Sequence, residues 1–259
     1  TGDCAGKEVV QLYCEAPQGM LGKPARTLCA FAKTKLLAAG EEQLLTLTVR
    51  KDELASYDDS GVTGHPFCEV LEAGTYRFFL GGDVRSAGEI GTFTLMETQV
   101  TAQRTQALAP VVPFQRMKNC GGKLTWEDVP LRKYDLQQRV QAHLPESLPM
   151  TGNRGFRLCD VADGKISMAD FVAQMDENML CTLVRGEGMC SPKVTPGTAG
   201  AFGGLSPKLQ ALGIPAICCA DGPSGIRMDC GTQAFLLPSG TCLACTFNET
   251  LISDLYACT

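Results

Sequence analysis

The stretch 214–227, IPAICCADGPSGIR, constrains the fold of this chain more than any other part of the sequence. Residues 214–220 form an uncharged run of strand length with no polar face, which suits a strand covered on both sides in a parallel α/β sheet or barrel. A segment of a buried helix is the alternative for so short a run. Turn residues follow at once at Gly222 and Pro223, and they favour the strand. The pattern therefore predicts a buried strand that delivers Asp221 to its end.

Asp221 and Arg227 are the candidate substrate-binding residues of this stretch. In an α/β barrel the ligand site is built from the carboxyl ends of the strands and the loops after them, so both side chains would meet a polar ligand. The alternative is a structural role. Asp221 would then accept backbone N–H groups in an Asx-type turn, and Arg227 would form a solvated ion pair. The local pattern alone does not decide between the two.

The segments around these residues resemble the catalytic barrel of glycoside hydrolase family 3, the β-glucosidase family. The resemblance covers residues 186–204 (GEGMCSPKVTPGTAGAFGG) and residues 213–248, and DGPSGIR is its specific part. It implies that Asp221 holds sugar hydroxyls in the subsite at the non-reducing end, with Arg227 beside it. Neither residue is the nucleophile by this resemblance.

Residues 6–49, followed by LASYDDSG and LEAGTYRFFLGGDVRSA, resemble the fibronectin type III-like domain of the same family. Most members carry this domain last, whereas here it precedes the barrel, as in a smaller subgroup with reversed domain order. The resemblance implies an internal fragment, with an α/β sandwich before residue 1 and the rest of the barrel after residue 259. The nucleophile, the acid/base and a lysine–histidine sugar-binding pair would lie outside the chain, so no catalytic residue is expected within it.

The predicted fold class is multidomain, β plus α/β. It comprises a fibronectin type III-like β-sandwich over 1–101, a linker over 102–165, and the N-terminal portion of a TIM-type (β/α)8 barrel over 166–259. Strand-like runs separated by turn residues support the sandwich. These runs are EVVQLYC, TLCAFAKTKL, QLLTLTV, TYRFFLG and GTFTLMETQ.

The remaining elements are expected in the later part of the chain. Prolines break the linker, which holds one short predicted helix near 134–142. A helical period begins at Ser167, which with Asp170 resembles a capping box. A second barrel strand is expected near 241–247, followed by a helix capped by Asn248 or Thr246. Within that helix, residues 253–255 superficially resemble the segment of the family that bears the nucleophile, but their helical pattern argues against a catalytic role.

Two further features, one in the linker and one in the barrel portion, bear on ligand binding. Trp126, the single tryptophan, lies in the predicted linker and would either anchor it against the barrel or reach a sugar pocket. A lone aromatic residue in a connecting segment more often docks. The loop 186–204 is rich in glycine, proline and threonine and is long enough to form a lid or site wall, with Glu187 and Lys193 as its notable polar groups.

Composition excludes several classes of partner. The net charge of −5 and the pI of about 5.2 argue against nucleic acid and anionic membranes, and no apolar run reaches spanning length. The fourteen cysteines lie mostly in apolar runs, which predicts free thiols in a reducing cytosol and hence a cytoplasmic protein. Cys242 and Cys245 form one CxxC without a second ligand pair, so neither a metal nor a cofactor is expected.

The resemblance implies that the parent protein is a retaining glycoside hydrolase of carbohydrate catabolism. It would remove terminal, non-reducing β-D-glucosyl residues from a β-linked glucoside or oligosaccharide. In such hydrolysis one carboxylate attacks the anomeric carbon and a second, ~5 Å away, protonates the leaving oxygen. The chain alone is expected to be inactive. The alternatives are a β-xylosidase or N-acetylglucosaminidase as the parent, or a non-catalytic β-sandwich that serves as a binding or scaffold module.

Overall fold

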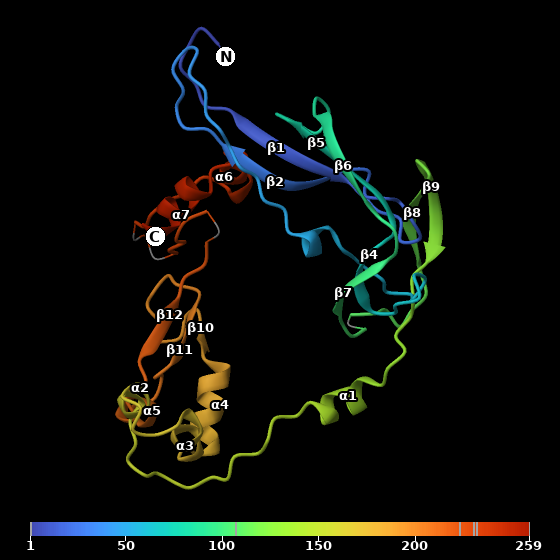
Figure 1. Cartoon of the computed structure of the whole chain (residues 1–259). Coiled ribbons are helices and arrows are strands. Elements are labelled where there is room, and N and C mark those ends of the chain that lie inside the picture. The colour runs from blue at the N-terminus through green and yellow to red at the C-terminus, as the bar shows by residue number, and fades with distance from the viewer. Residues whose placement is uncertain (1, 107, 223, 230, 232, 259) are drawn as a thin grey trace. The chain divides into compact units, whose positions relative to one another are not determined.

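The computed structural model describes residues 2–106, 108–222, 224–229, 231 and 233–258. Pro223 of the predicted turn therefore lies outside the described residues. The chain divides into two compact units, Thr1–His143 and Leu144–Thr259, called here the first unit and the second unit (Figure 1). The sequence-based boundaries at 101 and 165 stay predictions. No helix among the described residues is long and apolar enough to cross a membrane.

The first unit contains two antiparallel sheets of three or more strands, and a separate two-stranded hairpin is described below. One has the strand order β2-β1-β5-β6 and the other has the order β3-β4-β7. Four of the five predicted strands are confirmed by the first sheet. The strands are β1 (Val9–Glu15), β2 (Thr27–Lys33), β3 (Ser56–Tyr57), β4 (Cys68–Leu71), β5 (Gly74–Gly81), β6 (Gly88–Leu95) and β7 (Gln99–Gln103), with a 3-10 turn η1 (Lys51–Leu54).

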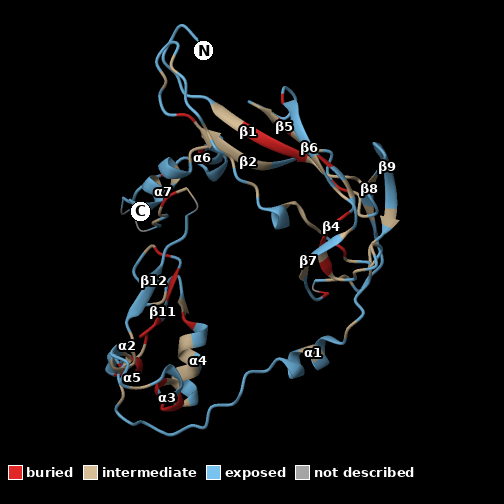
Figure 2. Cartoon of the chain, viewed as in Figure 1, coloured by how far each residue is buried: buried red, intermediate tan, exposed pale blue. Residues whose placement is uncertain are grey.

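The core of the first unit lies where the two sheets meet. Cys14 and Tyr76 from one sheet pack with Leu71 from the other, and all three are buried. The ring of Tyr76 stacks on Phe93 with centroids 4.7 Å apart, and its hydroxyl donates to the carbonyl of Glu72 at 3.1 Å. Figure 2 shows the buried stretch along β1. This is the two-layer packing of a β-sandwich.

The predicted strand QLLTLTV is wrong. Residues 43–49 form no strand, although their exposure alternates: Leu45, Leu47 and Val49 are half-buried while the residues between them are exposed. One side of the segment is therefore partly covered by the rest of the unit, but its backbone does not pair with a strand. The period of two in the sequence reports that alternation, but a strand also needs a neighbour to pair with.

The predicted linker holds a hairpin that the sequence analysis missed. β8 (Gln115–Cys120) and β9 (Lys123–Asp128) pair antiparallel around a two-residue turn. Gly121 and Gly122 have φ of +57° and +82°, as a type I′ turn requires. The short helix expected near 134–142 is confirmed as α1 (Leu136–Ala142), and Asp135 caps it by accepting from the amide of Gln138.

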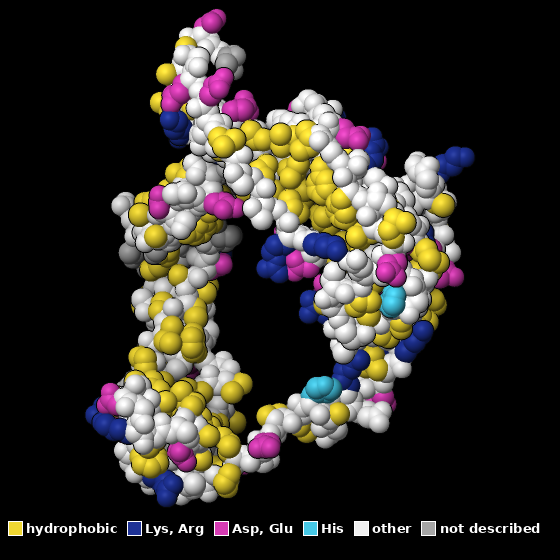
Figure 3. Space-filling view, in the orientation of Figure 1, with side chains coloured by type: hydrophobic (Ala, Val, Ile, Leu, Met, Phe, Trp, Pro, Cys, Tyr) yellow, Lys and Arg dark blue, Asp and Glu magenta, His cyan; other side chains and the backbone are white. Residues whose placement is uncertain are grey.

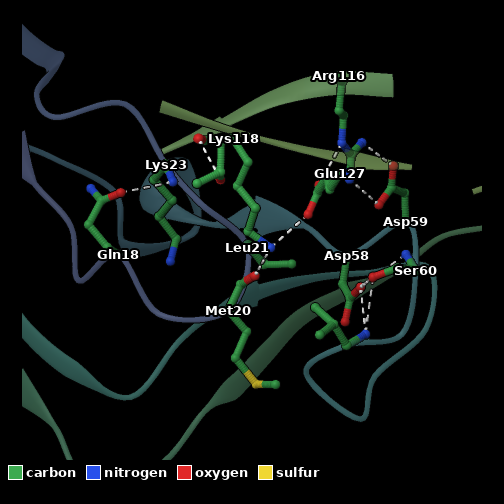
Figure 4. Close-up of polar contacts among 12 residues, drawn as sticks. Gln18, Met20, Leu21, Lys23, Asp58, Asp59, Ser60, Arg116, Lys118 and Glu127 are labelled. Atoms are coloured by element: carbon green, nitrogen blue, oxygen red, sulfur yellow. Dashed lines mark hydrogen bonds and ion pairs between the residues drawn. The ribbon is translucent and has the colours of Figure 1, made fainter. Parts of the chain in front are cut away.

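Two buried carboxylates organise loops of the first unit. Glu72 forms a buried ion pair with Lys23 and accepts from the amide of Met20 at 2.6 Å. Asp58, fully buried, accepts from the backbone N–H groups of residues 60–63 and from the hydroxyls of Ser60 and Thr63 (Figure 4). Burial acts to raise the pKa of Asp58, but these hydrogen bonds outweigh it and lower the pKa to about 2.

The second unit combines seven short elements of helix and sheet, followed by two helices. Its antiparallel sheet has the order β10-β11-β12. The larger cluster of buried apolar residues consists of Phe171, Met175, Leu209 and Leu212, and a smaller one consists of Val194, Ala201 and Leu205. The elements are α2 (Leu158–Ala162), α3 (Met168–Ala173), α4 (Glu177–Arg185), β10 (Glu187–Gly188), β11 (Gly200–Gly203), α5 (Pro207–Ala211), β12 (Ala216–Cys219), α6 (Gly240–Ala244) and α7 (Glu249–Ala257).

The helix caps predicted from the sequence are confirmed. The side chains of Ser167 and Asp170 form a capping box at the start of α3. Asn248 caps α7 by accepting from the amide of Leu251 at 3.1 Å. The helical period that begins at Ser167 is shared by two helices, because the side chain of Asp176 caps a new helix, α4, by accepting from an amide of its first turn.

Two expectations for the second unit are wrong. Residues 240–244 form helix α6, capped by the hydroxyl of Ser239, where a strand was expected. A short apolar run suits helix and strand equally, and the cap decides. Strand β12 exists, but its residues are exposed rather than covered on both sides, and within the described residues it pairs antiparallel with β11. The residues that the structure describes here therefore show no parallel strand pairing of the kind expected for a barrel.

Candidate functional site

The loop after β12 is closed tightly by its own backbone. The amide of Arg227 donates to the carbonyl of Asp221 at 2.7 Å, and the two residues form an antiparallel bridge. Gly222 and Gly225 have φ of +138° and +103°. A Cβ on Gly222 would lie 1.7 Å from the carbonyl oxygen of Gly225, so this turn has no room for a side chain there. The glycines of DGPSGIR thus fix the shape of the loop.

This geometry brings the two predicted binding residues together. Oδ2 of Asp221 lies 3.5 Å from Nη1 of Arg227, and Nε of Arg227 donates to Oδ1 of Asp229 at 3.1 Å. The side chains of Asp221 and Arg227 are 59% and 61% exposed. So exposed an ion pair contributes little to stability. Its carboxylate oxygens and guanidinium N–H groups are open to hydroxyl groups of a ligand.

The loop 186–204 lies against the Asp221 loop. The amide of Asp229 donates to the carbonyl of Gly197 at 3.0 Å, and the amide of Ala199 donates to the carbonyl of Cys219 at 2.9 Å. The ends of this predicted loop are strands β10 and β11. Backbone hydrogen bonds therefore hold the expected site wall beside the strand end that carries Asp221.

The two polar groups singled out in that loop pair with each other. Nζ of Lys193 lies 3.1 Å from Oε1 of Glu187, and this hydrogen bond holds the pKa of the Glu187 carboxyl below its ordinary value. Arg185 lies 3.6 Å from the other oxygen of the same carboxylate. Glu187 thus lies between two cations on β10, the edge strand opposite β12 in the three-stranded sheet. Its carboxylate is already engaged in ion pairs.

Residues of metal-ligating type do not gather in the part of the chain that the structure describes: no three His, Cys, Asp or Glu side chains lie close enough to hold an ion. Cys242 lies in α6 and Cys245 at its C-terminal end, both exposed with free thiols. Asp254, the residue of the nucleophile-like segment, lies within helix α7 as expected. The chemistry open to the Asp221 loop is therefore hydrogen bonding to a polar ligand.

Comparison with known proteins places the chain. A model of the fibronectin type III-like domain matches residues 8–84. A β-glucosidase of Ruminococcus albus is 57% identical over 255 residues, 98% of this chain and 27% of the relative. β-Glucosidase A of Butyrivibrio fibrisolvens is 34% identical over 285 residues, 98% of this chain and 32% of the relative. The chain thus spans about a quarter to a third of the length of these relatives.

A solved structure extends the match to three dimensions. The crystal structure of a β-glucosidase from Paenibacillus barengoltzii superposes with a TM-score of 0.92 at 51% identity, over 97% of this chain and 28% of that one. The matches define a β-glucosidase-type chain that carries a fibronectin type III-like domain. The chain belongs to glycoside hydrolase family 3. The resemblance stated from DGPSGIR and from the front of the chain is confirmed, whereas the role of Asp221 and Arg227 stays a prediction.

Proposed function

We propose that this chain is a stretch of a longer retaining β-glucosidase and supplies part of its sugar-binding site. The observation that carries the proposal is the loop at the end of β12, where two close-packed glycine positions hold an exposed carboxylate against an arginine. This loop lies in a sequence alignable over nearly its whole length with β-glucosidases. The substrate would be a β-linked glucoside or oligosaccharide with a terminal glucosyl residue.

Asp221 would accept hydrogen bonds from two neighbouring sugar hydroxyls. A carboxylate has two oxygens and about four lone-pair directions, and only one oxygen faces Arg227. Arg227 would orient that carboxylate, and Asp229 would in turn hold the guanidinium through its Nε. Hydrogen bonds to a charged acceptor are roughly twice as strong as neutral ones, so this contact would contribute much of the subsite's affinity.

The covalent steps would fall to residues of the parent outside this stretch. Asp221 is engaged with Arg227 and Arg227 with Asp229, an arrangement suited to holding a sugar. Retaining hydrolysis needs a nucleophile and an acid/base as a separate pair of carboxylates ~5 Å apart. The chain alone is therefore proposed to be inactive. We propose that the second unit forms the start of a (β/α)8 barrel. Exposed Ile217 on β12 supports this, because such a strand gains stability when further strands cover it.

We also propose a cytoplasmic location. Cys14 and Cys68 are 3% exposed and pack within the sandwich strands as small apolar side chains. Burial is the main cause that raises the pKa of the Cys14 thiol to about 11, so its reactive thiolate is scarce at neutral pH. Thiols so placed are compatible with a reducing compartment.

The proposal is tested by expressing the complete reading frame and assaying it on aryl β-D-glucoside and aryl β-D-xyloside. We expect hydrolysis of the glucoside, loss of most activity in Asp221→Ala, and no hydrolysis by the 259-residue chain. Asp254→Ala, on the exposed side of α7, is the matched control and should keep full activity. Preference for the xyloside would make the parent a β-xylosidase, and absence of hydrolysis of either would overturn the enzyme assignment.

A further inference from the structure

The β8–β9 hairpin exposes its large apolar side chains and directs charged side chains toward the sandwich. Its ladder places Met117 opposite Trp126, so both side chains lie on one face, and they are 65% and 59% exposed. The neighbouring cross-strand pair, Arg116 and Glu127, lies on the other face, and Nε of Arg116 donates to Oε1 of Glu127 at 2.7 Å. Figure 2 shows β9 exposed along most of its length. A hairpin that only had to pack would bury its tryptophan and leave its charges in water.

The inner, polar face anchors the hairpin to the sandwich. Arg116 forms a two-pronged pair with Asp59, and Lys118 donates to the carbonyl of Met20 at 3.0 Å and to Glu127 at 2.7 Å (Figure 4). The hydrogen bond from Arg116 to Asp59 is the largest cause that raises the pKa of the guanidinium. Asp59 itself follows the buried Asp58, whose hydrogen bonds fix that loop.

The anchoring makes the outer face a rigid platform. An isolated two-stranded hairpin is only marginally stable in water, and here the Arg116–Asp59 and Lys118–Met20 contacts supply what a third strand would. Side chains whose backbone is held in this way lose little freedom when a ligand arrives, which favours binding. Figure 3 shows apolar side chains on the surface over the right-hand part of the first unit, where Figure 1 places β8 and β9.

The outer face combines an aromatic ring with hydrogen-bonding groups. Gln115 and Asp128 form the cross-strand pair next to Met117 and Trp126, about 7 Å along the strands, and the Gln115 amide donates to Asp128 at 3.0 Å. Both are exposed. An indole with an adjacent amide and carboxylate complements a pyranose, whose C–H groups cover the ring while its hydroxyls hydrogen-bond beside it.

The small number of apolar side chains on the platform argues against a second copy of the chain as its partner. Its large apolar side chains are Met117, Leu124 and Trp126. A stable protein interface needs ~800 Å² and about 20–30 residues on each side, with a desolvated core. A single sugar ring needs one aromatic face and two or three polar groups. The chemistry on this face therefore fits a saccharide better than a second copy of the chain.

We propose that the outer face of the β8–β9 hairpin is a second carbohydrate-binding site, in which Trp126 stacks on a glucosyl unit of a β-glucan chain and Gln115 and Asp128 bind its hydroxyls. The β-linkage of the ligand rests on the proposed function. In β-D-glucopyranose every ring substituent is equatorial, so the flat C–H face is free to lie on the indole. The proposed site belongs to the first unit, whereas the Asp221 loop belongs to the second.

The sole tryptophan makes the test direct, because all tryptophan fluorescence of the chain comes from Trp126. The 259-residue chain is titrated with cellohexaose, laminarihexaose and, as the α-linked control, maltohexaose. We expect a saturable emission shift and protection from acrylamide quenching with at least one β-glucan oligomer and not with maltohexaose. Absence of any saturable change with both β-glucan oligomers would overturn the site.

A retardation assay in gels containing soluble β-glucan provides the second readout. Trp126→Ala should weaken retardation at least ~10-fold, as loss of a central aromatic anchor does, whereas Trp126→Phe keeps most of it. Met96→Ala, an exposed apolar residue elsewhere in the same unit, is the matched control and should migrate as the wild type. Equal retardation of Trp126→Ala and wild type would overturn the proposal, as would self-association lost in Trp126→Ala, which would assign the face to a second copy.

The outcome separates from that of the proposed function. Hydrolysis of aryl β-glucoside by the complete reading frame should be unchanged in Trp126→Ala, because a small aryl substrate does not need the platform. Retardation by β-glucan without hydrolysis would support the platform while the enzyme proposal fails. Hydrolysis without retardation would overturn the proposed second carbohydrate-binding site and support the enzyme proposal.

Discussion

The two units satisfy their residues in different ways. In the first unit, two sheets cover each other and the buried carboxylates Asp58 and Glu72 find partners within the unit. In the second, a compact helical core around Leu209 stands beside strand β12, whose Ile217 is 44% exposed. The difference lies in the strands: β1 buries four of its seven residues, whereas all four residues of β12 are exposed. Strand β1 therefore packs within its own unit, and β12 does not.

The largest stability effect is expected from breaking the buried pair in the first unit. Glu72→Ala leaves the Lys23 ammonium buried without its partner and removes the acceptor of the Met20 amide, so the free energy of unfolding should fall by about 3–5 kcal/mol. Urea unfolding followed by Trp126 fluorescence measures it. Glu89→Ala, which breaks an exposed pair with Arg77, is the control and should cost less than about 1 kcal/mol. Equal losses would refute the account of the first unit.

Two truncations to alanine compare a buried and an exposed position of the second unit. Leu209→Ala creates a cavity in a fully buried position and should destabilise helices α3 and α5 by about 2–5 kcal/mol. Ile217→Ala removes an exposed side chain and should change stability by less than about 0.5 kcal/mol in this chain. Hydrogen exchange of peptides from the second unit reports both. If Ile217→Ala were as costly as Leu209→Ala, β12 would be covered within this chain.

A smaller effect is expected from acid. The pKa of Asp58 is about 2 in the folded chain and ordinarily 3.8, so its ionised form contributes stability that is fully present above pH 4 and is lost as the pH falls toward 2. The contribution is about 2 kcal/mol. Asp58→Asn should remove this part of the pH dependence. An identical decrease between pH 4 and pH 2 in the variant and the wild type would contradict the role given to the loop 58–63.

The sequence predicted the sandwich because strand-like runs recur between turn residues. It failed at residues 43–49, where alternation persists without a pairing neighbour, and at β8–β9, where the inverted hairpin carries charges inward. Pattern rules assume that apolar residues face inward, so they cannot recognise a hairpin held by ion pairs. The run Gly121–Gly122 was the available signal, since adjacent glycines suit a two-residue turn.

The candidate binding residues were predicted from the sequence, but their environment was not. Asp221 and Arg227 lie together as the family resemblance implies, because Gly222 and Gly225 close the turn. The partner Asp229 was not predicted, since its contact with Arg227 depends on the path of the loop. The pairing of Glu187 with Lys193 was not predicted either, since it depends on the turns that follow β10. Such pairings depend on tertiary structure and leave no local signature.

Binding of glucose to the complete protein decides whether Asp221 holds the sugar. Titration calorimetry compares the wild type with Asp221→Asn, which keeps the shape of the side chain and removes its charge. Hydrogen bonds to charged groups contribute about 1.5–3 kcal/mol, so the affinity for glucose should be at least ~10-fold weaker in the variant. Equal affinity in the two proteins would contradict it, and Asp221 would then be a structural residue of its turn.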